Sequence, residues 1–142
     1  MITRSATAVW QGNLKGGKGN ISTQTGVLRD APYGFRSRFE SGPGTNPEEL
    51  LGAAHAGCYS MALALGLESA GITAERIETR ADVTLEQETN GFSITAIRLT
   101  CRARIPRIDI AMFEQIAEAT KQHCPVSKVL NARITLDARL DG

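Results

Sequence analysis

An apolar run, LLGAAHAGCYSMALALGL at residues 50–67, constrains the fold of this 142-residue chain more than any other feature. A helix on the surface of a globular protein shows a polar stripe, and this run barely has one. A transmembrane helix needs about 20 strongly apolar residues. The run is shorter, contains His55, and is flanked by glutamates without a nearby lysine or arginine. We therefore expect a buried helix and no membrane span.

The residues on either side of the run mark where this helix begins and ends. Asn46 can cap the first turn, Pro47 suits the first helical position, and two glutamates follow at the positive end of the helix. Gly71 provides a stop signal. The sequence thus predicts a helix from Pro47 to about Ser69.

Three glycines inside the predicted helix indicate close neighbours. Gly52, Gly57 and Gly66 each cost about 1 kcal/mol relative to alanine in a helix interior. Such glycines are easiest to understand where another backbone approaches closely. A chain of this length has too few elements to surround a helix, so we expect a homodimer with this helix at its centre.

Alternating apolar and polar residues predict six strands around two helices. The expected strands lie near residues 7–11, 21–27, 33–39, 77–85, 97–105 and 134–140, and a second helix is capped near Asp109 and interrupted at Cys124-Pro125. The order β-β-β-α-β-β-α-β favours a single α+β domain, residues 1–142, built on antiparallel sheet.

The overall composition excludes several function classes. Sixteen basic and fifteen acidic residues give a net charge of +1, and no basic run suggests nucleic acid. The N-terminal residues lack the apolar segment of a secretory signal, and three widely spaced cysteines do not form the framework of a secreted miniprotein, so we expect a cytoplasmic protein. The segment GNLKGGKG at residues 12–19 nearly matches a phosphate-binding loop, but Gly19 replaces the hydroxyl residue and a strand follows. We interpret this segment as a hairpin turn.

The three cysteines differ in their surroundings. Cys101 lies on the apolar face of a predicted strand, where a thiol behaves as a small hydrophobic side chain. Cys58 lies midway along the apolar helix and would need a nearby cation to react as a thiolate. Cys124 precedes Pro125 at a helix break, where the N–H groups of a new turn could favour a thiolate. Spacing alone does not say which of Cys58 and Cys124 attacks first, and either could be an inert buried thiol.

The two histidines leave further alternatives open. His55 lies three residues before Cys58, a spacing that would allow a Cys–His hydrolase, although a hydrogen-bonded core histidine is the plainer interpretation. The hydrolase lacks a nearby orienting acid. His123 adjoins Cys124, but no C-x-x-C or H-x3-H spacing supports a metal site.

Five segments in order along the chain resemble the OsmC/Ohr hydroperoxide reductase family. The segments are AVWQG (8–12), GVLRDAPYGFRSRFE (26–40), GTNPEELLGAAHAGCYSMAL (44–63), CPVSKVL (124–130) and ITLDARL (134–140). The resemblance implies an intertwined homodimer in which antiparallel sheets wrap around central helices and two active sites lie at the subunit interface.

The resemblance also implies a role for each site residue. Cys58 matches the peroxidatic cysteine, Cys124 the resolving cysteine, Arg38 the arginine that the OsmC branch places in its third strand, and Glu48 the glutamate that orients that arginine. The implied enzyme is a peroxidase that reduces organic hydroperoxides, and hydrogen peroxide more weakly, through a Cys58 sulfenic acid and a Cys58–Cys124 disulfide. The family name adds a link to osmotic and oxidative stress.

No metal, haem, flavin or selenium is implied, and an external dithiol, a lipoylated protein in this family, would reduce the disulfide. Glu48 precedes Cys58 by ten residues, about 15 Å along a helix. We therefore expect the Arg38–Glu48 pair that faces a given Cys58 to come from the other subunit. The main alternative is a dimer of the same fold that binds lipids or small molecules without catalysis.

Overall fold

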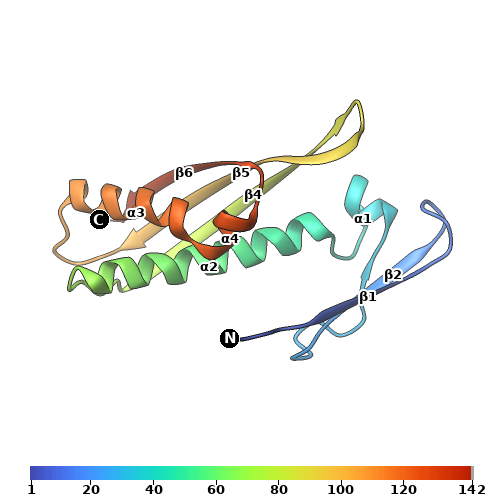
Figure 1. The fold of residues 1–142 in the computed structure, drawn as a ribbon, viewed down its shortest axis with the longest axis horizontal. Coiled ribbons are helices and arrows are strands. Elements are labelled where there is room, and N and C mark those ends of the chain that lie inside the picture. The colour runs from blue at the N-terminus through green and yellow to red at the C-terminus, as the bar shows by residue number, and fades with distance from the viewer. Residues whose placement is uncertain (142) are drawn as a thin grey trace. The chain divides into compact units, whose positions relative to one another are not determined.

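The computed structural model describes residues 1–141 and divides the chain into two compact units, residues 1–50 and the part from Leu51 onward. The first unit contains β1 (Ala6–Gln11), β2 (Lys18–Thr23), β3 (Ala31–Tyr33) and α1 (Phe35–Phe39). The helix α2 (Pro47–Ser69) begins in it and continues into the second unit. The second unit also contains β4 (Arg76–Glu88), β5 (Gly91–Arg104), α3 (Ile110–His123), α4 (Pro125–Val129) and β6 (Arg133–Leu140) (Figure 1).

A three-stranded antiparallel sheet in the order β1-β2-β3 forms the first unit. Residues 12–17 connect β1 to β2, and Gly12 adopts a φ of 97°, so the near-match to a phosphate-binding loop is a hairpin turn, as predicted. β2 ends at Thr23, earlier than expected, because the chain turns there, with Gly26 donating to the Thr23 carbonyl.

The third strand ends earlier than predicted, because residues 35–39 form the short helix α1. Gly34 begins this helix, and the Ser37 hydroxyl accepts a hydrogen bond from its N–H at 2.9 Å. Tyr33, Phe35 and Phe39 fit an alternating strand pattern, but Phe35 and Phe39 are also four residues apart, which places them on one helix face with ring centroids 5.1 Å apart. The expectation that Arg38 lies in a strand is therefore wrong: it lies on α1.

The helix α2 has the predicted bounds. Asn46 Oδ1 accepts a hydrogen bond from the Glu49 N–H at 2.8 Å, and Gly71 follows the helix with a φ of 77°. By length and composition α2 is long and apolar enough to cross a membrane, which is weak evidence since core helices pass the same test. One stripe of α2 is buried in the second unit: Gly52, His55, Tyr59, Leu63 and Leu67.

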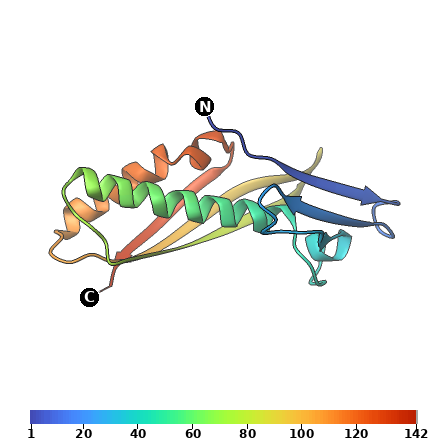
Figure 2. The ribbon, with the colours of Figure 1, turned by 90° about the horizontal axis from the view of Figure 1, so that it is seen from below.

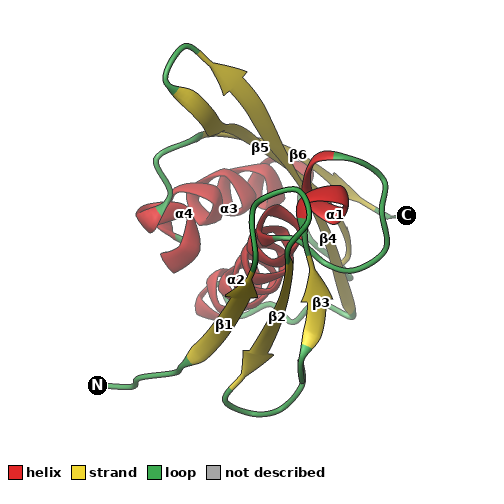
Figure 3. Ribbon diagram, turned by 90° about the vertical axis from the view of Figure 1, so that its right-hand side faces the viewer, coloured by secondary structure: helices red, strands yellow, loops and turns green. Residues whose placement is uncertain are grey.

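The core of the second unit lies between its helices and its sheet. α2 and α3 lie on the same face of the sheet β4-β5-β6 (Figures 1 and 3). Alternate residues of β5 face these helices and are buried: Ile97, Leu99, Cys101 and Ala103. Phe113 and Ala117 of α3 are buried in the same cluster.

The second sheet is mixed, which differs from the antiparallel expectation. β4 and β5 form an antiparallel hairpin that turns at Asn90-Gly91, whereas β6 pairs with β5 in parallel, Ala96 opposite Arg133. The connection through α3 and α4 explains the difference, because a helical crossover returns the chain to the end where β5 began. Figure 2 shows α3, in orange, alongside α2, in green.

Candidate active site

Cys58 and Cys124, far apart in sequence, meet in the second unit. Cys58 lies near the middle of α2, and Cys124 connects α3 to α4. Their sulfur atoms are 3.0 Å apart, and both are free thiols. Cys124 is fully buried, whereas Cys58 is partly exposed. A small movement would therefore bring the sulfurs to the bonding distance of about 2.05 Å.

The two thiols are unequal because their surroundings differ. Burial raises the pKa of Cys58, and its hydrogen bond with Cys124 raises it further, outweighing an opposing backbone bond from Val126. Burial also acts to raise the pKa of Cys124, but hydrogen bonds from Cys58, the backbone and side chain of Ser127, and the Val126 backbone together lower it. Of the two thiols, Cys124 is therefore the more acidic, in line with its position at a helix break.

Cys101 has the packing role expected of it. It is fully buried on β5, and burial raises the pKa of its thiol to about 11, although the Thr79 hydroxyl acts in the opposite direction. A thiol with so high a pKa reacts slowly at neutral pH, because the thiolate is the nucleophile.

Arg38 and Glu48 form an ion pair in the first unit. Arg38 Nε lies 2.9 Å from Glu48 Oε1, and the glutamate is 8% exposed. The Asn46 side chain donates a hydrogen bond to the Ser37 carbonyl at 2.9 Å, which fastens α1 to the start of α2. Among the described residues, Glu48 Oε2 has no hydrogen-bond partner. The two residues thus contact each other within one chain, with Arg38 on α1 and Glu48 on α2.

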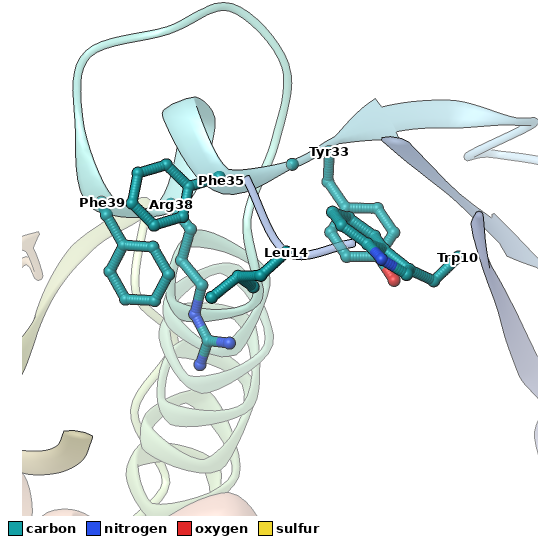
Figure 4. A pocket seen from close by; sticks show the side chains of 7 residues that line it. Trp10, Leu14, Tyr33, Phe35, Arg38 and Phe39 are labelled. Atoms are coloured by element: carbon teal, nitrogen blue, oxygen red, sulfur yellow. The ribbon is translucent and has the colours of Figure 1, made fainter. Parts of the chain in front are cut away.

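Aromatic side chains surround the arginine. Arg38 lines a pocket of about 280 Å³ whose other lining residues are Trp10, Leu14, Tyr33, Gly34, Phe35 and Phe39 (Figure 4). The Arg38 Cζ lies 5.5 Å from the centroid of the Phe39 ring, a cation–π distance. The pocket thus combines an apolar wall with one guanidinium.

Comparisons with known proteins identify the family of the chain. Residues 40–139 match the family model of OsmC-like protein. The chain belongs to the OsmC-like family. It is 52% identical to peroxiredoxin OsmC of Escherichia coli, over 98% of this chain and 97% of that protein.

Solved structures of the family share the fold. An organic hydroperoxide resistance protein from Elizabethkingia anophelis superposes with a TM-score of 0.69 at 27% identity, covering 100% of this chain and 97% of the other. An OsmC-like protein of unknown function from Vibrio cholerae superposes with a TM-score of 0.78 at 13% identity, covering 97% and 99%.

His55 has a partner that sequence reasoning missed. Its Nε2 lies 2.7 Å from Ser127 Oγ, and burial lowers its pKa below the ordinary value of 6.5. The two residues are 72 positions apart, so no spacing rule could pair them.

Residues 1–141 contain no group of three or more histidine, cysteine or acidic residues that could hold a metal ion.

Proposed function

We propose that this chain is a thiol peroxidase that reduces organic hydroperoxides, and hydrogen peroxide more weakly. The observation that carries the proposal is the 3.0 Å contact between the Cys58 and Cys124 sulfurs, in a chain 52% identical to a peroxiredoxin. Two thiols already in contact can form a disulfide without a large rearrangement, which gives the second step the advantage of proximity.

The cycle has three steps. The Cys58 thiolate attacks the terminal peroxide oxygen, the O–O bond breaks, and the substrate leaves as an alcohol after taking up a proton, with Cys58 oxidised to a sulfenic acid. Cys124 then condenses with this sulfenic acid, which releases water and forms the disulfide. Finally an external dithiol, a lipoylated protein by family resemblance, reduces the disulfide by exchange and is itself oxidised.

The first step needs a cation beside Cys58. Its pKa is raised by burial and by Cys124, so the thiolate is scarce without one. We assign this role to Arg38 of the partner subunit, oriented by Glu48. Within one chain Arg38 is bound to Glu48, which is ten residues, about 15 Å, before Cys58 along α2.

The pocket around Arg38 favours an organic substrate. Trp10, Tyr33, Phe35 and Phe39 provide apolar surface for a hydrocarbon group, and the guanidinium can hold the peroxide oxygens. Hydrogen peroxide lacks the hydrocarbon group, so we expect it to react more slowly.

An exposed stripe of α2 supports a homodimer. Ala53, Gly57, Met61 and Leu65 follow one another at intervals of four residues and are all exposed. Met61 and Leu65 are 78% and 65% exposed. A Cβ added to Gly57 would meet no atom within 4 Å, unlike Gly52 and Gly66, which have neighbours in the chain. A second copy of the chain would cover this stripe and explain Gly57.

The remaining parts of the proposal follow from the cysteine chemistry. Two cysteines and an external dithiol complete the cycle, so the proposal includes no metal or prosthetic group. A transient, catalytic disulfide suits the reducing cytoplasm, where we place the protein. We include neither nucleic acid nor a membrane among its partners.

Thiol titration before and after one equivalent of cumene hydroperoxide tests the proposal. We expect two thiols per chain to disappear and a Cys58–Cys124 disulfide to appear by peptide mapping. A non-catalytic binding dimer would lose no thiols in proportion to peroxide. A Cys–His hydrolase would be acylated at Cys58 by an activated ester and would not react with peroxide. In this structure His55 contacts Ser127, which does not favour its use as a base for Cys58.

Single cysteine variants separate the roles. Cys58→Ser should abolish turnover, and Cys124→Ser should permit one oxidation per subunit before excess peroxide inactivates the protein. Cys101→Ser is the matched control and should retain turnover and the disulfide with a modest loss of stability. Turnover by Cys58→Ser would reverse the assignment of the two cysteines.

A further inference from the structure

A buried histidine and a serine lie behind the resolving cysteine. His55 on α2 is fully buried, and its Nε2 is 2.7 Å from Ser127 Oγ on α4. Ser127 follows Cys124 by three residues, and its side chain lies close enough to the Cys124 thiol to lower the pKa of that thiol. His55, Ser127 and Cys124 therefore form a continuous chain of polar contacts that leads to the reacting pair.

The other ring nitrogen of His55 indicates the direction in which hydrogen bonds are donated along these contacts. Among the described residues, the buried Nδ1 has no hydrogen-bond partner. A buried N–H without a partner is rarer in proteins than an acceptor without one. The neutral ring thus carries its proton on Nε2, which donates to Ser127 Oγ. This leaves the Ser127 hydroxyl proton free to point at Cys124.

We propose that His55 is a positioning residue for the second step, holding the Ser127 hydroxyl as a hydrogen-bond donor to the Cys124 thiolate. The inference deepens the proposed function and rests on it. Ser127 touches the reacting sulfur, whereas His55 acts through Ser127.

The second step joins the two sulfurs and releases water. After the first oxidation Cys58 is a sulfenic acid, and Cys124 has released its proton to solvent. The Cys124 thiolate attacks the Cys58 sulfur, the S–S bond forms as the S–O bond breaks, and the departing hydroxide takes a proton from solvent to become water. The Cys124 sulfur is oxidised and the Cys58 sulfur is reduced, both to the disulfide level.

The test measures Cys124 directly and needs no peroxide. In a Cys58→Ser, Cys101→Ser background, Cys124 is the one remaining cysteine, and the NMR chemical shift of its labelled Cβ reports its ionisation. Burial keeps the pKa of the neighbouring Tyr59 far above its ordinary range, so Tyr59 does not titrate with Cys124.

Four added substitutions divide the outcomes. Ser127→Ala and His55→Leu remove the donors and should raise the midpoint of the Cys124 titration by about one to two pH units. His55→Gln retains an N–H donor and should restore a midpoint close to that of the background protein. Ser60→Ala is the matched control: it removes a 2.7 Å hydroxyl contact with Thr79 from the same helix and should leave the midpoint unchanged.

Two results would overturn the inference. One is an unchanged midpoint in Ser127→Ala, which loses a single oxygen atom and should fold even where His55→Leu does not. The other is an equal shift in His55→Gln and His55→Leu, which would show that an N–H donor at position 55 does not act on Cys124.

A second measurement links the chain of contacts to turnover. With Cys58 and Cys101 restored, Ser127→Ala should form the disulfide at least about tenfold more slowly after one equivalent of hydroperoxide, because less Cys124 is thiolate. Oxidation of Cys58, trapped with dimedone, should not become slower. If the parent protein does not react with hydroperoxide, the proposed function fails, while the titration still decides whether His55 and Ser127 favour the Cys124 thiolate. Equal disulfide rates in a reactive parent and Ser127→Ala would refute the inference alone.

Discussion

At the scale of single residues, the surroundings of the two sulfurs in the candidate site shift their pKa values in opposite directions. Cys124 has hydrogen-bond donors within its own unit, from Ser127 and the Val126 backbone, and these lower its pKa against the effect of burial. Burial and the neighbouring Cys124 thiol both raise the pKa of Cys58. In the proposed cycle, the peroxidatic role of Cys58 therefore needs a cation that we assign to a second subunit, whereas groups that favour a Cys124 thiolate lie within the same chain.

His55 should make the stability of the protein depend on pH. Burial lowers its folded pKa below 6.5, so the unfolded chain binds a proton that the folded chain does not. The stability tied to neutral His55 is complete above pH 6.5 and is lost as the pH falls below this value. We expect urea unfolding between about pH 7.5 and 5.5 to show a larger loss in the parent than in His55→Leu.

The exposed His123 provides the control for this prediction. His123→Gln should keep the pH dependence of the parent, since the change removes no buried histidine. An identical pH dependence in the parent and His55→Leu would show that His55 is not the residue responsible.

The residues of the site were only partly predictable from sequence. A helix break before Pro125 marked Cys124 as an activated thiol, since free N–H groups follow from local geometry. Its contact with Cys58, 66 residues away, depends on how α2 packs, and the resemblance rather than spacing suggested that pairing. The His55–Ser127 contact had no sequence signal beyond a histidine in an apolar helix.

At the scale of elements, local signals decided which predictions were confirmed. α2 has strong signals at both ends, Asn46-Pro47 and Gly71, and its bounds were predicted correctly. α1 was missed because it is only five residues long. Its aromatic side chains at positions 35 and 39 fit the period of a strand as well as that of a helix. The parallel pairing of β6 depends on the crossover through α3, which no pattern within a strand records.

Asn46 should matter to both folding and activity. It caps α2 through its Oδ1 and holds α1 through the bond from its Nδ2 to the Ser37 carbonyl. Asn46→Ala should cost about 1 kcal/mol of stability for the lost cap. The substitution should also slow peroxide reduction, because it releases α1, which carries Arg38. Chemical unfolding and steady-state peroxidase assays measure the two effects.

Asp109→Ala is the matched control for the cap. Asp109 caps α3 by accepting from the Ala111 N–H at 3.3 Å and has no part in the Arg38–Glu48 arrangement. It should lose similar stability and keep its rate. Full activity in Asn46→Ala would contradict the prediction, because it would show that peroxide reduction does not depend on holding α1 in place.

At the scale of the whole molecule, the proposed site draws its residues from both units of the chain, and the proposal assigns their meeting to a dimer. The cysteine pair lies in the second unit, and the Arg38–Glu48 pair lies in the first. The exposed stripe of α2 offers a surface for a second copy. A site completed across subunits predicts that two inactive variants can complement each other.

Mixed dimers test this directly. Arg38→Met and Cys58→Ser should each be inactive as homodimers. Refolded together, half of the dimers carry both chains, and each of these has one complete site, so the mixture should regain about a quarter of the parent activity. A site confined to one chain would give no recovery. Cys58→Ser mixed with Cys124→Ser provides the contrast: because the two sulfurs meet within one chain, no mixed dimer holds an intact pair, and turnover should stay absent.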